Sequence, residues 1–238
     1  MFVPIHDKNP LKRIPFQYVT VGIIALNIIL YVVFQSGWFF PIDERVAAFA
    51  LIPAEFWSGT ASLSDGVSVP EGAFPVQERW TLATYMFVHG SFLHLLGNAL
   101  FLWVFGDNVE DAMGHVRFLL FYLICGIFAG LAHTFVFNAS RIPVIGSSGA
   151  VAGVVAAYLM LHPKVKIWVL ALWRIPIKIS AAWVLGFWVV LQIGSALLSD
   201  GDGVAWWAHV GGLVAGAVLI LFMRRPGVPL FDRTMSGA

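Results

Sequence analysis

Long apolar runs divide this chain into segments that can each cross a membrane. A helix needs about 20 mostly apolar residues to cross a hydrocarbon core of roughly 30 Å. Four stretches meet this requirement without any Asp, Glu, Lys or Arg: Tyr18–Gln35, Phe118–Phe137, Ile179–Leu198 and Gly203–Met223. Two less regular stretches, Trp80–Phe105 and the glycine-rich Ile145–Leu161, raise the expected number of spans to six. The pattern predicts an all-α membrane protein.

The second and fourth spans have start signals inside the apolar pattern. Gly90-Ser91 is typical of a turn followed by a helix N-cap, which predicts a helix that continues through Glu110 to a stop near Gly114. Trp80–His89 then belongs to the preceding loop. In the fourth span, Ala150–Leu161 is too short to cross alone, so the loop before it is expected to dip into the bilayer. We expect Ser148 to begin this helix below the outer surface.

The composition supports this class of protein. Hydrophobic residues make up 59% and charged residues 11% of the chain, against averages of roughly 45–50% and 25% for soluble domains. These values exclude a soluble α/β enzyme and a disordered chain. The net charge of +1 offers no basic field for nucleic acid. The single cysteine, Cys125, cannot form an internal disulfide.

The basic residues predict the topology. With a cytoplasmic N-terminus, the inside segments hold eleven Lys and Arg residues and the outside segments only Arg45, Arg79 and Arg141, as the positive-inside rule expects. Residues 1–238 are interpreted as one domain with cytoplasmic tails at 1–17 and 224–238. Met1–Phe16 lacks the apolar core of a cleavable signal, so the first span is expected to remain. Aromatic residues within Gly37–Arg79 predict a long outside loop that lies partly at the membrane interface.

Polar side chains inside spans are costly and therefore mark candidate functional positions. His209 lies six residues inside the last span, about 9 Å deep, and Asn98 lies at about 10–12 Å if its helix opens at Gly90-Ser91. Ser148 is expected at a similar depth. The full set is His89, His94, Asn98, His133, Ser147, Ser148, Gln192 and His209.

Glycine spacing predicts that the fourth and sixth spans pack closely. Gly149 and Gly153 form one GxxxG pair, and Gly212 and Gly216 form another on the face that carries His209. Close contact between these faces would bring His209 to Ser148. The alternative is that these serine and histidine side chains are structural and bond across helices.

A serine and a neutral histidine in contact can perform nucleophilic catalysis, with Ser148 as nucleophile and His209 as general base. No carboxylate is placed to orient the imidazole, so the sequence predicts a dyad. The Asn98 amide, the His94 side chain and the Ser148 backbone N–H are candidate oxyanion donors. For His89, three roles stay open: packing of the loop, contact with a water molecule, or an interfacial position without a role in the chemistry. His133 is interpreted as structural.

At these residues the chain resembles the rhomboid family of intramembrane serine proteases. Gly146-Ser147-Ser148-Gly149 resembles the GxSG motif, His94 to Asn98 the HxxxN motif, and Ala208-His209 with Gly212 and Gly216 the AHxxGxxxG motif. Glu110 is similar to a glutamate that ends the second span in this family. The resemblance implies a six-transmembrane-helix rhomboid-like bundle in a bacterial plasma (inner) membrane, with the active site opening outward. It also implies cleavage of membrane-anchored proteins in or near a transmembrane segment, without cofactor or metal.

Two positions depart from the family pattern. A frequent Trp-Arg pair in the first loop reads Trp80-Thr81, and Ala152 stands where some members place an aromatic residue that stacks on the histidine. His209 is therefore expected to be held by backbone packing. Other classes stay open: a transporter with a polar pathway, a metalloenzyme ligated by His89, His94 and His209, and a catalytically silent scaffold that binds membrane helices. The oligomeric state is not predicted.

Overall fold

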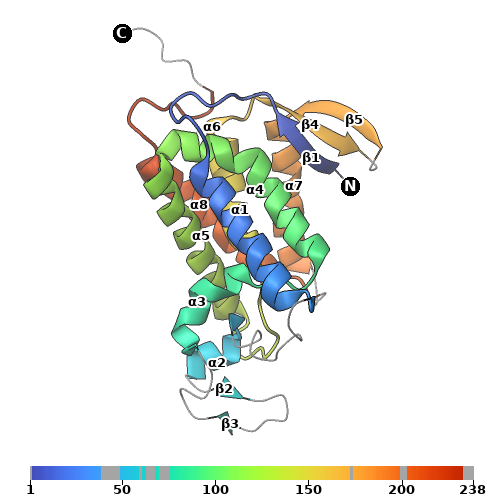
Figure 1. Ribbon diagram of the computed structural model, residues 1–238, viewed down its shortest axis with the longest axis vertical. Coiled ribbons are helices and arrows are strands. Elements are labelled where there is room, and N and C mark those ends of the chain that lie inside the picture. Colours follow the sequence, from blue (N-terminus) through green and yellow to red (C-terminus); the bar gives the residue numbers. More distant parts are fainter. Residues whose placement is uncertain are drawn as a thin grey trace.

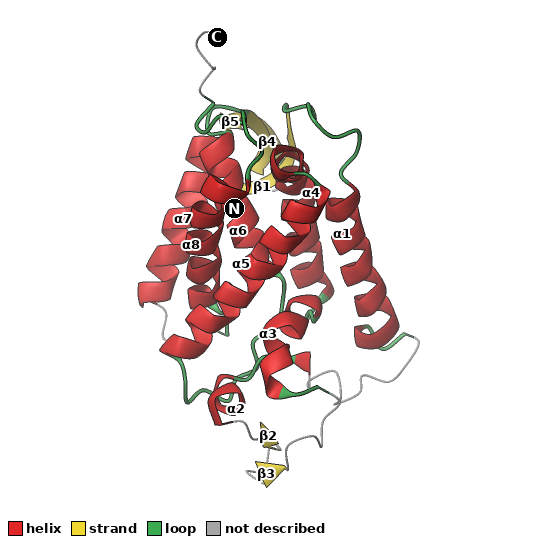
Figure 2. Ribbon diagram, turned by 90° about the vertical axis from the view of Figure 1, so that its left-hand side faces the viewer, coloured by secondary structure: helices red, strands yellow, loops and turns green. Residues whose placement is uncertain are grey.

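The computed structural model describes residues 2–38, 49–58, 61–62, 68–69, 76–171, 174–198 and 203–232. Within these ranges the protein is a helical bundle with a small sheet at one end, and α2, β2 and β3 at the other (Figures 1 and 2). Five helices are long and apolar enough to cross a membrane: Tyr18–Gln35, Phe92–Met113, His115–Val136, Ala181–Leu198 and Trp206–Met223. The predicted helical membrane bundle is thus observed.

The long helices agree closely with the predicted spans. Tyr18–Gln35 consists of α1 (Tyr18–Leu30) and a π-helical turn, η1 (Tyr31–Gln35). The others are α4 (Phe92–Met113), α5 (His115–Val136), α6 (Ser148–Leu161), α7 (Ala181–Leu198) and α8 (Trp206–Met223). The predicted count of six depends on α6, which has 14 residues and is shorter than a full span.

Helix α4 begins and ends where its capping residues predict. The Ser91 hydroxyl accepts a hydrogen bond from the His94 backbone N–H at 3.2 Å, which is an N-cap. The helix ends at Gly114, whose φ of 86° lies in the left-handed region that favours glycine. The preceding segment contains the short helices η3 (Glu78–Trp80), α3 (Thr81–Thr84) and η4 (Tyr85–Phe87). It therefore belongs to the loop, as expected for Trp80–His89.

A buried carboxylate fixes the start of α1 to the end of α4. Glu110 is fully buried and accepts hydrogen bonds from the backbone N–H groups of Val19 and Thr20 and from the Thr20 hydroxyl, at 2.7–3.0 Å. Its Oε1 also lies 2.5 Å from His115 Nδ1. Because the first N–H groups of a helix lack partners within the helix, Glu110 acts as a cap supplied from another helix.

The sheet was not predicted from the sequence. β1 (Phe2–Asp7), β4 (Lys166–Ala171) and β5 (Ile175–Ser180) form an antiparallel sheet in the order β1-β4-β5, at the end of the bundle where α6 ends and α7 begins. β5 occupies the first residues of the span predicted from Ile179, so α7 begins two residues later.

The long outside loop lies largely beyond the described residues. Its described parts include α2 (Pro53–Ser58) and the two-residue strands β2 (Ala61–Ser62) and β3 (Ser68–Val69). The indole of Trp57 in α2 donates a hydrogen bond to the Thr134 carbonyl of α5 at 3.0 Å. This contact joins the loop to the bundle. The prediction that residues 37–79 lie partly at the membrane interface is not tested here, because most of them fall outside the described ranges.

Candidate active site

Glycines bring the backbones of α6 and α8 into direct contact. A Cβ atom added to Gly212 would collide with the backbone carbonyl of Gly149, and one added to Gly216 would collide with that of Gly153. Only glycine, which has no side chain, allows two helix backbones to lie this close together. The predicted pairing of the two GxxxG motifs is therefore present, and it places the start of α6 beside the face of α8 that carries His209.

At this contact the predicted serine and histidine meet. His209 Nε2 lies 2.8 Å from Ser148 Oγ, which is hydrogen-bonding distance. Ser148 is the first residue of α6 and is half-buried, whereas His209 lies in the first turn of α8 and is 8% exposed. An imidazole this close to a hydroxyl can accept its proton, which is the arrangement that activates a serine.

The other side of the imidazole contacts α7, which the sequence did not predict. Gln192 Oε1 lies 2.7 Å from His209 Nδ1, and the Trp188 ring stacks on the imidazole with centroids 6.5 Å apart and planes inclined by 30°. Trp206 adds an edge-on contact at 5.6 Å. His209 is therefore held by side chains of α7 in addition to the backbone packing of α8 on α6 that the sequence predicts. Trp188 of α7 supplies the aromatic contact that Ala152 cannot make.

A sequence signal for this contact was available. Gln192 is a strongly polar residue in an otherwise apolar span, and Trp188 precedes it by four positions, so both share one helix face. The sequence does not show which helix this face of α7 contacts, because no motif links α7 to His209.

The turn before α6 places His94 near the serine. Gly146 has a φ of 109°, a conformation that favours glycine, and a Cβ atom there would lie 2.5 Å from the His94 ring. His94 therefore packs against the backbone two residues before Ser148. Unlike Ser91 at the start of α4, Ser147 at the N-cap of α6 does not cap its helix with its side chain. The start of α6 thus keeps N–H groups available for a ligand.

Asn98 lies one turn after His94 on the same face of α4. Helix α4 packs against α6. Asn98 is 9% exposed, and its side-chain nitrogen is buried without a hydrogen-bond partner among the described residues. A buried amide donor is costly when it is unpaired. This nitrogen is thus available to an acceptor that enters the site.

The remaining polar candidates have separate positions. His89 is buried, its backbone N–H donates to Gln35 Oε1 at 2.7 Å, and its Nε2 lies 3.3 Å from the Ser147 hydroxyl. It packs the loop before α4, which is one of the three roles that the sequence left open. His133 lies near the end of α5 against the Phe137 ring, at a centroid distance of 5.0 Å. Within the described ranges, no group of three His, Cys, Asp or Glu side chains could hold a metal ion.

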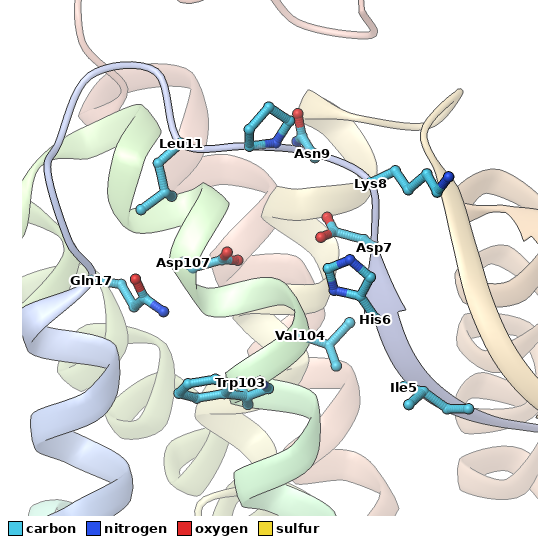
Figure 3. Close-up of a pocket in the computed structure, with 11 residues that line it drawn as sticks. Ile5, His6, Asp7, Lys8, Asn9, Leu11, Gln17, Trp103, Val104 and Asp107 are labelled. Carbon is cyan, nitrogen blue, oxygen red and sulfur yellow. The ribbon is translucent and has the colours of Figure 1, made fainter.

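A polar hollow lies far from the serine, between β1, the segment that joins β1 to α1, and α4 (Figure 3). It has a volume of about 450 Å³, and the side chains of Asp7, Lys8 and Asp107 line it. Asp7 is buried and accepts a hydrogen bond from the Tyr158 hydroxyl at 2.5 Å; burial raises the pKa of its carboxyl. Tyr158 lies ten residues along α6 from Ser148, about 15 Å away. This hollow is thus separate from the contact between Ser148 and His209.

The fold and the site together define a helical membrane protein with a hydrogen-bonded serine and histidine inside the bundle. A family model described as "Rhomboid domain" matches residues 76–226, which include α4 to α8. This match covers more than half of the chain, and the protein therefore belongs to the rhomboid family.

Individual relatives agree with this assignment. The chain is 32% identical over 157 residues to RHOMBOID-like protein 1 of Arabidopsis thaliana, covering 66% of this chain and 38% of that protein. It is 29% identical over 145 residues to Rhomboid protease GlpG of Haemophilus influenzae, covering 59% and 68%. It is also 34% identical over 84 residues to the Putative rhomboid protease YdcA of Bacillus subtilis, covering 35% and 42%.

The matches to three Arabidopsis proteins span only 38–45% of their lengths. The similarity to proteins named as proteases supports protease activity at the level of the family. It also agrees with the predicted integral, multi-pass membrane protein, which the five apolar helices support independently.

Proposed function

We propose that this protein is an intramembrane serine endopeptidase that cleaves membrane-anchored proteins in or near a transmembrane segment. The observation that carries the proposal is the 2.8 Å contact between His209 Nε2 and Ser148 Oγ at the junction of α6 and α8. Membership of the rhomboid family supports the reaction class. No cofactor or metal is required for this chemistry.

In the proposed mechanism the Ser148 hydroxyl gives its proton to His209 Nε2 while its oxygen attacks the carbonyl carbon of the scissile peptide. The resulting oxyanion would accept hydrogen bonds from the Asn98 amide, the His94 imidazole and the Ser148 backbone N–H. His209 then returns the proton to the leaving amine, and an acyl-enzyme remains on Ser148. A water molecule, deprotonated by the same imidazole, hydrolyses this ester.

We further propose that residues 1–238 act as one membrane domain, with tails at 1–17 and 224–238 on the cytoplasmic side of a bacterial plasma membrane. The excess of Lys and Arg in segments at the sheet end of the bundle supports this orientation. The site would then open toward the outside, where its water originates. The substrates are transmembrane proteins, and the lipid bilayer is the surrounding solvent.

Covalent labelling of the detergent-solubilised protein with a fluorophosphonate tests this function. We expect labelling at Ser148 that is lost in Ser148→Ala, falls strongly in His209→Ala and is unaffected by a chelator. Ser147→Ala is the matched control, because that buried neighbouring hydroxyl contacts His89 and not His209. Its labelling should persist.

A set of reconstituted single-span proteins provides the second readout. Cleavage that requires both Ser148 and His209 supports the proposal. Labelling that persists in Ser148→Ala, or a parent protein that neither reacts nor cleaves, would overturn it and favour a non-catalytic scaffold or a transporter.

A further inference from the structure

Helix α7 presents one buried polar side chain to the bundle. Its buried residues are Ala181, Leu185 and Gln192, of which only Gln192 is polar. Gln192 is 6% exposed, and its amide oxygen lies 2.7 Å from His209 Nδ1. A buried amide with a short contact to the nitrogen opposite the serine is an arrangement that the serine–histidine chemistry alone does not account for.

We infer that Gln192 is a positioning residue that fixes His209 in the tautomer required for proton transfer; this inference rests on the proposed function. Neutral imidazole carries one N–H, and its other nitrogen is an acceptor. If Gln192 Oε1 accepts the hydrogen of Nδ1, the lone pair of Nε2 is directed at the Ser148 hydroxyl. The opposite tautomer would direct an N–H at Ser148, and no base would be available.

An amide suits this position better than the carboxylate of a catalytic triad. A charged carboxylate within a membrane helix is costly, while an amide oxygen accepts the same hydrogen bond without carrying charge. An amide also does not titrate, so its acceptor is present at every pH at which the imidazole is neutral. Gln192 therefore supplies the orienting function of a triad's third member but does not stabilise the imidazolium with a full charge.

Trp188 assists from the same helix face. It lies four residues before Gln192, and its ring stacks on the imidazole whose edge Gln192 contacts. The hydrogen bond restricts rotation of the ring in its own plane, and the stacked indole restricts its tilt. The active conformation of His209 thus depends on α7, although His209 itself belongs to α8.

Two substitutions of nearly equal size separate the possible roles of the amide. Gln192→Leu removes the acceptor, while Gln192→Glu can accept a hydrogen bond but cannot donate one when ionised. We expect Gln192→Leu to lower kcat by about 10- to 100-fold, the size of loss found when the partner that orients a metal-ligating histidine is removed, with KM changed less than about twofold. Gln192→Glu should keep more activity than Gln192→Leu.

The pH profile distinguishes positioning from a structural role. A carboxylate at residue 192 favours the protonated imidazole, so the acid limb of kcat/KM for Gln192→Glu should move to higher pH. Among the described residues, the other titratable groups that act on His209 are His94 on α4 and His133 on α5; α7 carries none, and α6 carries only Tyr158. These groups are the same in the parent and in Gln192→Glu, so a shift of the acid limb of kcat/KM is caused by the change at residue 192.

Ile193→Ala is the matched control, since this neighbouring side chain is 43% exposed on the outer face of α7. It should leave kcat and the pH profile unchanged. Equal activity of parent and Gln192→Leu would overturn the inference, and so would equal losses in the Leu and Glu variants with an unmoved acid limb. The proposed function fails separately, because it requires loss of labelling in Ser148→Ala whatever happens at residue 192.

Discussion

Helix α8 contacts α6 and α7 by different means. Against α6 it packs backbone to backbone, because Gly212 and Gly216 lie on the carbonyl groups of Gly149 and Gly153. Against α7 it meets the side chains of Trp188 and Gln192, which bridge to His209. In the contact of α8 with α6, neither backbone can move closer. The contact of α8 with α7 is made by side chains, which have rotamer freedom.

In the proposed mechanism, this difference separates the reacting atoms from the groups that orient them. Ser148 and His209 belong to the two helices in fixed contact, so their separation depends on the rigid interface. The acceptor for Nδ1 belongs to α7, whose outward side chains Trp183, Val190 and Leu198 are all more than 60% exposed. A displacement of α7 would therefore preserve the serine–histidine pair while removing the partner that selects its tautomer.

The largest expected effect comes from the rigid interface. Gly212→Ala places a methyl group on the backbone of Gly149, which has no flexible end that could move away. Overpacking usually lowers the free energy of unfolding by about 1–3 kcal/mol. Because the added methyl group meets backbone atoms, we expect a loss at the upper limit of this range or above. We expect the Tm to fall by about 6–12 °C, with loss of labelling at Ser148. Thermal unfolding in detergent and the fluorophosphonate assay measure both quantities.

Gly186→Ala provides the control on α7. A Cβ atom at Gly186 would meet nothing within 4 Å. Replacement of glycine by alanine in a helix interior then adds up to about 1 kcal/mol of helix propensity. The variant should be as stable as the parent or slightly more so, with unchanged labelling. Equal losses at both glycines would contradict the contrast between the two interfaces.

The rigid interface and the contact between Ser148 and His209 were predictable from the sequence. Glycine spacing within single helices identified the α6–α8 contact, and residue counts along the spans predicted that Ser148 and His209 lie at a similar level. Ser91 and Gly114 fixed the bounds of α4 through capping rules. Each of these signals is local: it lies within one helix and requires no knowledge of the neighbouring one.

The adjustable interface was not predictable in the same way. The role of Gln192 and Trp188 can be recognised only when the contact of α7 with α8 is known, because their partner His209 lies in a different span. The sheet was missed for a related reason. β1 pairs with β4 across more than 150 residues, and neither segment shows clear alternation of apolar and polar positions. Both failures concern contacts between different segments of the chain, which no pattern within one segment reveals.

A second prediction tests a group that belongs to neither interface. The Asn98 amide nitrogen on α4 has no partner among the described residues, so its removal should affect the reaction and not the fold. We expect Asn98→Ala to lower kcat by about 100-fold, as loss of an oxyanion donor does elsewhere. The Tm should change by less than about 2 °C, since at most a weak contact is lost. Steady-state cleavage and thermal unfolding separate these effects, and an unchanged kcat would remove Asn98 from the mechanism.

The smallest expected effect comes from the stacked ring on α7. Trp188→Leu keeps an apolar side chain against His209 but removes the aromatic contact, which is worth about 0.5–1.5 kcal/mol and therefore about 2- to 12-fold in the rate of labelling at Ser148. Because Trp188 and Gln192 restrict the same ring, the double variant with Gln192→Leu should lose less than the product of the two single losses. Fully independent losses would show that the two side chains act on different steps. A collapse of Tm comparable to that of Gly212→Ala would show that α7 is as rigidly built into the bundle as α6.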